Sequence, residues 1–215
     1  MYEKYLKRQL DILLSSLALI VLSPVILLAA VLIKLESPGP VFFTQKRVGK
    51  NQILFDIFKF RTMREGTPAD VPTERFRHTD QITRVGKFLR KTSLNELPQL
   101  LNIIKGDMSI IGPRPALWNQ HDLIELREKY RANAVRPGLS GFAQINGRDT
   151  IDNRTKARFD GYYVRNISFV FDLKCIIGTL LTVMHNSGVV EGGIGVLARQ
   201  EMATAQDRAM AVGKR

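Results

Sequence analysis

An apolar run near the N-terminus constrains the fold of this 215-residue chain more than any other feature. Residues 12–33 contain no charged side chain and are long enough to cross a hydrocarbon core of roughly 30 Å as a straight helix. Ser23-Pro24 lies at the midpoint of this run, where a proline removes a helical hydrogen bond and bends the axis. Each half then measures roughly 16 Å, which matches one leaflet. The pattern favours a helix that enters the membrane, breaks at Ser23-Pro24 and returns.

Basic residues flank this run on both sides, which bears on its orientation. Lys4, Lys7 and Arg8 precede it and Lys34 follows it. A spanning helix would place basic residues on both membrane faces, against the positive-inside tendency, whereas a re-entrant helix keeps both flanks in the cytoplasm. A simple transmembrane helix remains an alternative. A cleaved signal peptide is disfavoured, because the run is long for one and no small-x-small cleavage site follows it.

The chain as a whole is strongly basic, with a formal net charge of +12 and a pI near 10.1. Three kinds of anionic partner fit this charge: nucleic acid, an anionic membrane face and phosphorylated substrates. The single cysteine, Cys175, excludes an internal disulfide framework. His78, His121 and His185 show no metal-ligand spacing, so we expect no zinc site.

Residues 84–115 combine several features of a phosphate site. Ser93-Leu94-Asn95-Glu96 fits a capping box, in which Ser93 accepts a hydrogen bond from the amide of Glu96 and the Glu96 side chain reaches back. If Asn95 is itself the cap, Pro98 falls harmlessly inside the first turn. Whether the helix is capped by Ser93 or by Asn95, Asn95 and Glu96 lie at the positive end of its dipole, where anions are stabilised. A simple helix cap is the alternative. The surrounding cations are Arg84, Lys87, Arg90, Lys91 and Arg114.

A β-hairpin is predicted between this segment and the apolar run. Residues 41–45 and 53–60 are rich in β-branched and aromatic side chains and are separated by the turn residues Gly49-Lys50-Asn51. Alternation along the second strand puts Lys59 and Arg61 on one face, where two cations suit a diphosphate. A solvated strand face is the alternative interpretation.

The second half of the chain predicts helices and one glycine-rich loop. Residues 119–131 have the pattern of an exposed amphipathic helix. Residues 136–148 contain several glycines between two arginines, Arg136 and Arg148. Glycines let a ligand approach the backbone and arginines suit phosphate oxygens, although a structural loop would have a similar composition. Residues 159–171 interleave aromatic and basic side chains. Such a pattern occurs at membrane interfaces and in proteins whose aromatic rings stack on nucleobases. The apolar run near the N-terminus favours the membrane interpretation. Residues 173–184 are too short to span and predict a core or interfacial helix.

These motifs occur together and in a fixed order. They are Ser23-Pro24; Ser37 to Phe43; Gln45 with Arg47 and Gly49; Lys59 to Met63; Leu94 to Leu100; Gly106 to Ser109; Gly112 to Pro115; Arg136 to Gly138; and Gln144 with Asn146-Gly147-Arg148. Over about residues 7–193 the chain resembles the bacterial sugar transferase family of small monotopic phosphoglycosyl transferases.

The resemblance implies an α/β fold and a place at the cytoplasmic face of the inner membrane. Its parts would be a re-entrant membrane helix over residues 1–36, a catalytic domain over residues 37–195 and a tail over residues 196–215. The catalytic domain would hold a small β-hairpin or sheet and several helices, some lying at the membrane interface.

The resemblance also implies a chemistry. Members of the family move a sugar-1-phosphate from a UDP-sugar to polyprenol (undecaprenyl) phosphate and release UMP, the first membrane step of glycoconjugate assembly. They use an Asp-Glu pair, Mg²⁺ and a covalent phosphosugar on the Asp. By position, Glu96 would be the second acid, and residues 95 and 96 the metal ligands. The implied substrate-binding residues are Lys59, Arg61, Arg90, Arg114, Gln144 and Arg148.

The chain departs from this pattern at the nucleophile, where Asn95 stands in place of the Asp. A carboxamide is a poor nucleophile and a poor Mg²⁺ ligand, so the covalent step should be lost or strongly slowed. Three accounts are open: an Asp to Asn change that silences the enzyme, a natural variant with another route, and a member that binds without catalysing. The intact surrounding motifs favour a site that is otherwise competent.

A membrane-tethered binding or scaffold protein with a basic surface is the competing class. It explains the charge and the anchor but not the order of the glycine, proline and arginine motifs. Nucleic-acid binding is weaker still, because no groove-reading helix or RNA-binding motif is evident. The sequence names neither the sugar nor the oligomeric state.

Overall fold

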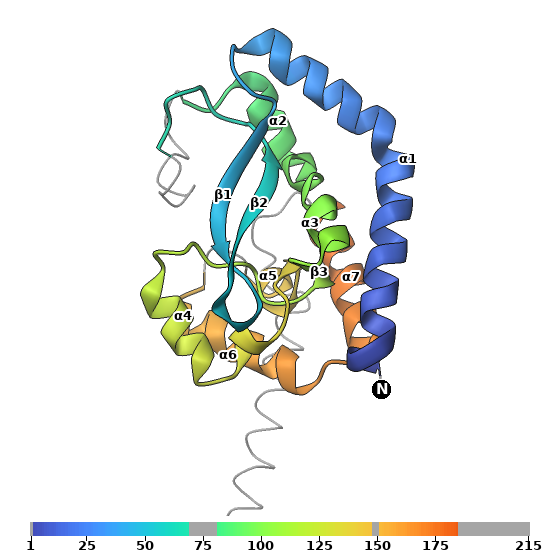
Figure 1. The fold of residues 1–215 in the computed structure, drawn as a ribbon, viewed down its shortest axis with the longest axis vertical. Coiled ribbons are helices and arrows are strands. Elements are labelled where there is room, and N and C mark those ends of the chain that lie inside the picture. The colour runs from blue at the N-terminus through green and yellow to red at the C-terminus, as the bar shows by residue number, and fades with distance from the viewer. Residues whose placement is uncertain (1, 69–80, 148–150, 185–215) are drawn as a thin grey trace, which may run out of the picture.

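The computed structural model describes residues 2–68, 81–147 and 151–184 of the chain. Figure 1 shows a mixed α/β fold with a long N-terminal helix along one side, which confirms the predicted class. In order, the helices and strands are α1 (Lys7–Glu36), β1 (Phe42–Val48), β2 (Leu54–Phe60), α2 (Arg84–Lys91), α3 (Gln99–Lys105), β3 (Ser109–Ile111), α4 (His121–Glu128), β4 (Gly138–Ser140), α5 (Phe142–Ile145), α6 (Asn153–Arg165) and α7 (Phe169–Met184). A π-helical turn, Tyr2–Leu6, precedes α1.

Helix α1 carries Pro24 in its interior and bends part-way along its length (Figure 1). Pro24 has no N–H to donate to the carbonyl of Ile20, four residues earlier. The hydroxyl of Ser23 donates to that carbonyl instead, at 2.8 Å. The Ser-Pro pair therefore bends the helix while leaving no bare carbonyl on an apolar surface. The helical stretch Tyr2–Glu36 is long and apolar enough to cross a membrane by length and composition.

Polar contacts attach α1 to the rest of the protein near both ends. Arg8 donates to two carbonyl oxygens in the last turn of α3, at 2.5 and 2.8 Å. The carboxylate of Asp11 accepts from the backbone N–H of Ile110 at 3.0 Å. At the far end, the carboxylate of Glu36 accepts from the first two amides of α2, at 2.6 and 2.9 Å. Most of the apolar side chains between these contacts remain exposed.

Strands β1 and β2 form the predicted antiparallel hairpin, with Phe42 opposite Phe60. The first strand runs three residues further than expected, to Val48. Phe60 is buried against Ala29 and Ile33 of α1, which joins the hairpin to the second half of that helix. A second small sheet pairs β3 and β4 in parallel.

The predicted capping box at Ser93 is wrong. Ser93 is left-handed, with φ of 59°, and its side chain makes no capping hydrogen bond. The amide of Glu96 donates to the backbone carbonyl of Ser93 at 3.1 Å, closing a 3₁₀ turn, Leu94–Glu96, ahead of α3. Nor is Asn95 the cap of α3, since that helix begins at Gln99 with Pro98 at its N-cap. The physical reason is that the Glu96 side chain points away, toward two cations described below.

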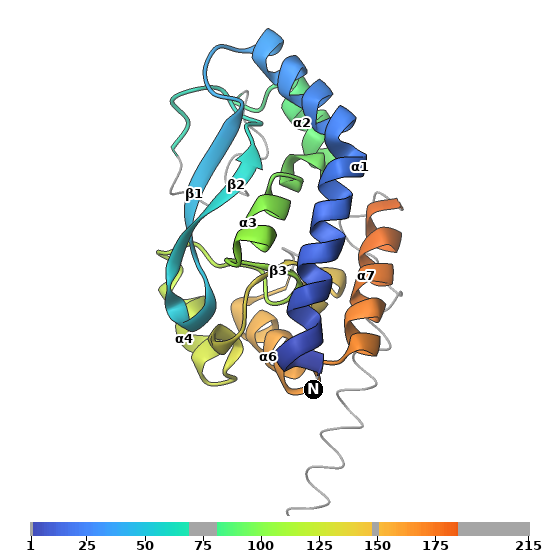
Figure 2. The same cartoon turned by 45° about the vertical axis from the view of Figure 1, so that its right-hand side comes forward.

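Helix α7 lies beside the N-terminal half of α1 (Figure 2). The buried carboxylate of Asp172 accepts from Tyr2, Lys7 and Tyr163, at 2.6, 2.5 and 2.7 Å. This one side chain ties the start of α1 to α6 and α7. The expected helix over residues 173–184 is thus confirmed, although it begins earlier. Its exposed apolar side chains are Phe169, Val170, Leu173, Ile177, Leu180 and Leu181.

Candidate active site

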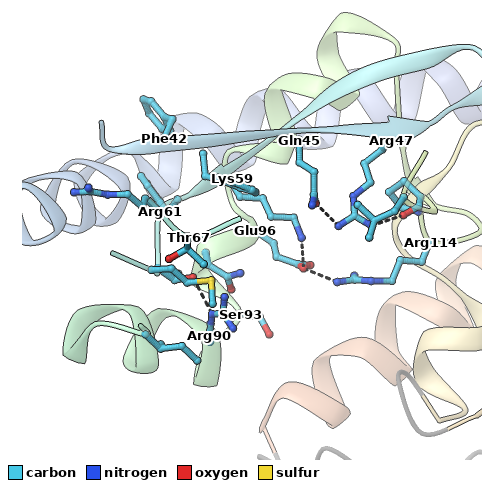
Figure 3. Close-up of a pocket in the computed structure, with 18 of the residues that line it drawn as sticks. Phe42, Gln45, Arg47, Lys59, Arg61, Thr67, Arg90, Ser93, Glu96 and Arg114 are labelled. Atoms are coloured by element: carbon cyan, nitrogen blue, oxygen red, sulfur yellow. Dashed lines mark hydrogen bonds and ion pairs between the residues drawn. The ribbon is translucent and has the colours of Figure 1, made fainter. Parts of the chain in front are cut away.

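A cavity of about 790 Å³ opens between the hairpin, the 3₁₀ turn and the helices α4 to α6. Figure 3 shows side chains from the two strands and from the turn pointing into it. It brings together most of the sequence-predicted site residues that lie in the described part of the chain. The predicted residues that line it are Lys59, Arg61, Arg90, Asn95, Glu96, Arg114 and Gln144.

Glu96 is the central carboxylate of this cavity. Its Oε1 accepts from Nζ of Lys59 at 3.3 Å and from Nη2 of Arg114 at 2.9 Å (Figure 3). The side chains of Lys59 and Glu96 are each 15% exposed, so water screens this contact only in part. The cluster carries one negative and two positive charges. The excess charge favours an anionic ligand.

Burial lowers the pKa of Lys59 to about 8, because the charged ammonium loses water. The neighbouring cations Arg114 and Arg47 lower this pKa further, whereas Glu96 opposes the change. Lys59 can therefore gain or lose its proton close to neutral pH. A lysine tuned in this way is typical of functional sites.

Two further arginines of the cavity are braced by neutral partners. Nε of Arg90 donates to the hydroxyl of Thr62 at 2.8 Å, and Arg47 donates to the side chain of Gln45 at 2.5 Å. Arg47 also donates to the carbonyl of Pro115 at 3.0 Å, which fixes the end of β1 against the turn that carries Arg114.

Two other predicted residues, Arg61 and Gln144, line the cavity and also donate hydrogen bonds to backbone carbonyls. Arg61 donates to the carbonyls of Ser37, at 2.8 Å, and Pro38, so its guanidinium holds the turn after α1 while also lining the cavity. Gln144 is buried and donates to the carbonyl of Leu139 at 3.1 Å. The predicted Arg148 lies outside the described residues.

Asn95 is half-buried and lines the cavity next to Glu96. Its carboxamide makes no hydrogen bond within the described ranges. Arg127 and Lys156 also line the cavity, although no sequence pattern indicated a site there. Arg127 occupies a helix whose charge pattern is that of an ordinary exposed face, so no local signal distinguishes it.

Among the described residues there is no cluster of three or more His, Cys, Asp or Glu side chains that could hold a metal ion. Glu96 and the carboxamide oxygen of Asn95 are the donors at the predicted metal position. Mg²⁺ commonly uses one or two carboxylates, keeps several waters and takes its other ligands from substrate phosphates. These residues therefore fit Mg²⁺ only in company with a phosphorylated substrate.

Comparison with known proteins decides the family. Residues 2–186 match the family model described as bacterial sugar transferase. The chain is a member of the bacterial sugar transferase family. This confirms the resemblance inferred from the motifs.

Several characterised or named members of this family are similar to the chain. It is 42% identical to the UDP-N-acetylgalactosamine-undecaprenyl-phosphate N-acetylgalactosaminephosphotransferase of Aeromonas hydrophila, covering 86% of the chain and 45% of that relative. It is 41% identical to the UDP-glucose:undecaprenyl-phosphate glucose-1-phosphate transferase of Escherichia coli, covering 83% and 40%. It is 43% identical to the exopolysaccharide production protein PSS of Rhizobium leguminosarum, covering 82% and 94%. The chain thus spans less than half of the first two relatives and nearly all of the third.

Proposed function

We propose that this sugar transferase binds a UDP-sugar and transfers its sugar-1-phosphate to polyprenol phosphate, with release of UMP. The observation that carries the proposal is the carboxylate of Glu96, held between Lys59 and Arg114 in a basic cavity. The names of two relatives, which specify UDP-sugars and undecaprenyl phosphate, support it. The third relative's name supports a role in building an exopolysaccharide.

In this proposal, the cations of the cavity hold the diphosphate of the donor. Lys59, Arg90 and Arg114 would neutralise its oxygens and orient the phosphorus next to the sugar toward residue 95. Protonated Lys59 would also stabilise the charge that develops on the departing UMP. Glu96 and Asn95 would hold Mg²⁺ jointly with the diphosphate, and the metal would supply further charge neutralisation when bound.

Asn95 sets the rate in this proposal. A carboxylate at position 95 would attack phosphorus, displace UMP and later pass the phosphosugar to an oxygen of the lipid phosphate. The carboxamide of Asn95 cannot perform that attack efficiently. We therefore propose that the chain binds its donor but turns it over slowly. Asn95 either silences the site or leaves only a slower, direct transfer of the sugar-1-phosphate to the lipid phosphate.

Asn95→Asp tests this account. We expect UMP release from a UDP-sugar, polyprenol phosphate and Mg²⁺ to rise by on the order of 10⁴- to 10⁶-fold, the range of losses on removing a nucleophile. Mass analysis should then detect a phosphosugar adduct on the protein. Asn166→Asp, which adds the same charge at the exposed C-cap of α6, is the control. No gain over this control would contradict the account of a silenced enzyme.

We also propose that residues 1–36 form a re-entrant anchor on the cytoplasmic face of the inner membrane. The bend at Pro24, the hydrogen bond of Ser23 and the exposed apolar surface of α1 support this arrangement. The cavity would then belong to a catalytic unit over residues 37–195 at the membrane surface, with a tail over residues 196–215.

Donor binding separates this proposal from a membrane-tethered scaffold. A ligand at 100 times its dissociation constant stabilises a protein by about 2.7 kcal/mol, which raises its melting temperature measurably. We expect UDP-sugars with Mg²⁺ to stabilise the protein in detergent. The absence of any shift across UDP and UDP-sugars would favour the scaffold.

A further inference from the structure

The cavity has two chemically different ends. At one end, the rings of Phe42 and Phe60 stack with centroids 5.6 Å apart, and Phe42 is 47% exposed. At the other end, Val48 packs against Leu123 of α4. Phe42 and Arg47 both line the cavity, and the strand between them extends roughly 17 Å at about 3.3 Å per residue. The cavity is therefore long enough for the two ends to receive different parts of one ligand.

An ion pair lies at the end of the cavity formed by α4 and α6. Nε of Arg127 donates to Oδ2 of Asp160 at 2.8 Å, and Nη2 lies 2.7 Å from the same oxygen in an ion pair. Both residues are buried, with exposures of 5% and 1%. Joining α4 to α6 would account for such a pair structurally. That account does not explain why Arg127 lines the cavity.

Arg127 has donor capacity left after pairing with Asp160. A guanidinium has five N–H groups, and two are engaged by that carboxylate. Within the described residues the Arg127 side chain makes no other hydrogen bond. Lys156, one turn before Asp160 on α6, also lines this end of the cavity. The wall thus offers several N–H donors to a ligand.

The Arg127–Asp160 pair itself favours a neutral, oxygen-rich group, and Lys156 adds one positive charge beside it. Asp160 cancels the charge of Arg127, so the pair offers hydrogen bonds with less attraction for a second phosphate than the cluster at Glu96 offers. The lining residues from α4, α5 and α6 include no aromatic ring. A nucleobase binds best where it can stack, and this end of the cavity offers no such face.

We propose that Arg127 donates hydrogen bonds to the hydroxyl oxygens of the donor's sugar and thereby contributes to the choice of sugar. Asp160 is a positioning residue that holds the guanidinium at the cavity wall. Lys156 adds a second donor beside it. This inference rests on the proposed function, because it assumes that the diphosphate lies at Lys59 and Arg114.

Equilibrium binding tests this subsite without requiring turnover. The double variant Arg127→Met/Asp160→Asn removes the donors without leaving a charge buried alone. Its affinities for UDP, UDP-glucose, UDP-galactose and their N-acetylamino forms would be measured by calorimetry in detergent. We expect the affinity for UDP to stay within about twofold and that for the preferred UDP-sugar to fall about tenfold or more.

Two results would overturn the inference. Equal weakening of UDP and UDP-sugar would place the pair at the nucleotide end or give it a purely structural role. Unchanged affinity for every ligand would show that the pair does not touch the donor. If the unmodified protein bound neither UDP nor UDP-sugars, the proposed function itself would fail, which is a separate outcome.

A conservative variant keeps the test valid if the double variant does not fold. Arg127→Lys retains the charge opposite Asp160 but loses the planar fork. We expect it to change the ratio of affinities among UDP-sugars while the affinity for UDP stays the same, and an unchanged ratio would count against the subsite. Lys129→Met, at the exposed end of the same helix, is the matched control and should leave every ratio unchanged.

Discussion

The ammonium of Lys59 should make the proposed binding of an anionic ligand sensitive to pH in an unusual range. Its pKa is about 8, because it is buried and lies near Arg114 and Arg47, whereas an exposed lysine titrates above pH 10. Below pH 8 the side chain is charged and attracts phosphate oxygens. As the pH rises through 8 the free protein loses this charge, so binding of an anion becomes weaker.

The affinity for UDP should therefore fall between pH 7 and pH 9. We expect a decrease of about tenfold, the cost of losing one charge-assisted hydrogen bond, measured by calorimetry at constant ionic strength. Lys59→Arg, which remains charged throughout this range, is the comparison and should bind UDP with little change over the same interval. A parallel decrease in both proteins would assign the pH dependence to another group.

Arg61 shows what residue-level patterns can and cannot predict. Its place on the strand, beside Lys59, indicates a cation near the cavity, and the structure places it in the cavity lining. The pattern contains no information about the carbonyls of Ser37 and Pro38, to which Arg61 donates across more than twenty residues. A contact of that length depends on the tertiary fold, so local alternation cannot reveal it.

Secondary-structure features were predicted correctly where neighbouring residues determine them. Turn residues and β-branched runs define the hairpin, and Ser23-Pro24 defines the bend in α1. The capping box failed for the opposite reason. Glu96 is bound by Lys59 and Arg114, which lie 37 and 18 residues away, and these charges outweigh a neutral local cap.

The bend in α1 should determine how this helix sits in the membrane. In Pro24→Ala the restored N–H can donate to the carbonyl of Ile20, so the helix can straighten and cross the bilayer. We expect a Glu3→Cys label, in a Cys175→Ala background, to react from the cytoplasmic side in the parent. With Pro24→Ala added, the label should react from the opposite side in the molecules in which the contacts of Tyr2, Lys7 and Arg8 with the rest of the protein have broken.

Labelling with a membrane-impermeant reagent in intact and opened cells measures this difference. Leu28→Ala, on the same helix but away from the proline, controls for the loss of apolar volume. If Glu3→Cys reacts only from outside while Pro24 is present, α1 spans the membrane and the re-entrant proposal is wrong.

Asp172 joins distant parts of the molecule into one unit. Its carboxylate is 5% exposed and forms an ion pair with Lys7, itself 12% exposed, at 2.5 Å. Asp172→Asn would leave the lysine without its counter-charge in a buried setting. We expect this change to lower the free energy of unfolding by about 3–5 kcal/mol, measured by denaturant unfolding in micelles.

A surface ion pair of the hairpin provides the control for this measurement. Lys46 and Asp56 are 59% and 53% exposed and lie 3.1 Å apart. Asp56→Asn should lower the free energy of unfolding by about 1 kcal/mol or less, because water and ions screen exposed charges. Similar losses in both variants would mean that Asp172 does not anchor α1.

The contact between Glu36 and α2 has a mechanical consequence for the whole protein. Glu36, the last residue of α1, accepts hydrogen bonds from the first two amides of α2, the helix that carries Arg90, so the two helices cannot slide independently. One residue inserted between Pro24 and Glu36 would advance the end of α1 by about 1.5 Å and rotate it by roughly 100°. In the proposed membrane-bound arrangement, the length of α1 after Pro24 would therefore set the height of the cavity above the bilayer midplane.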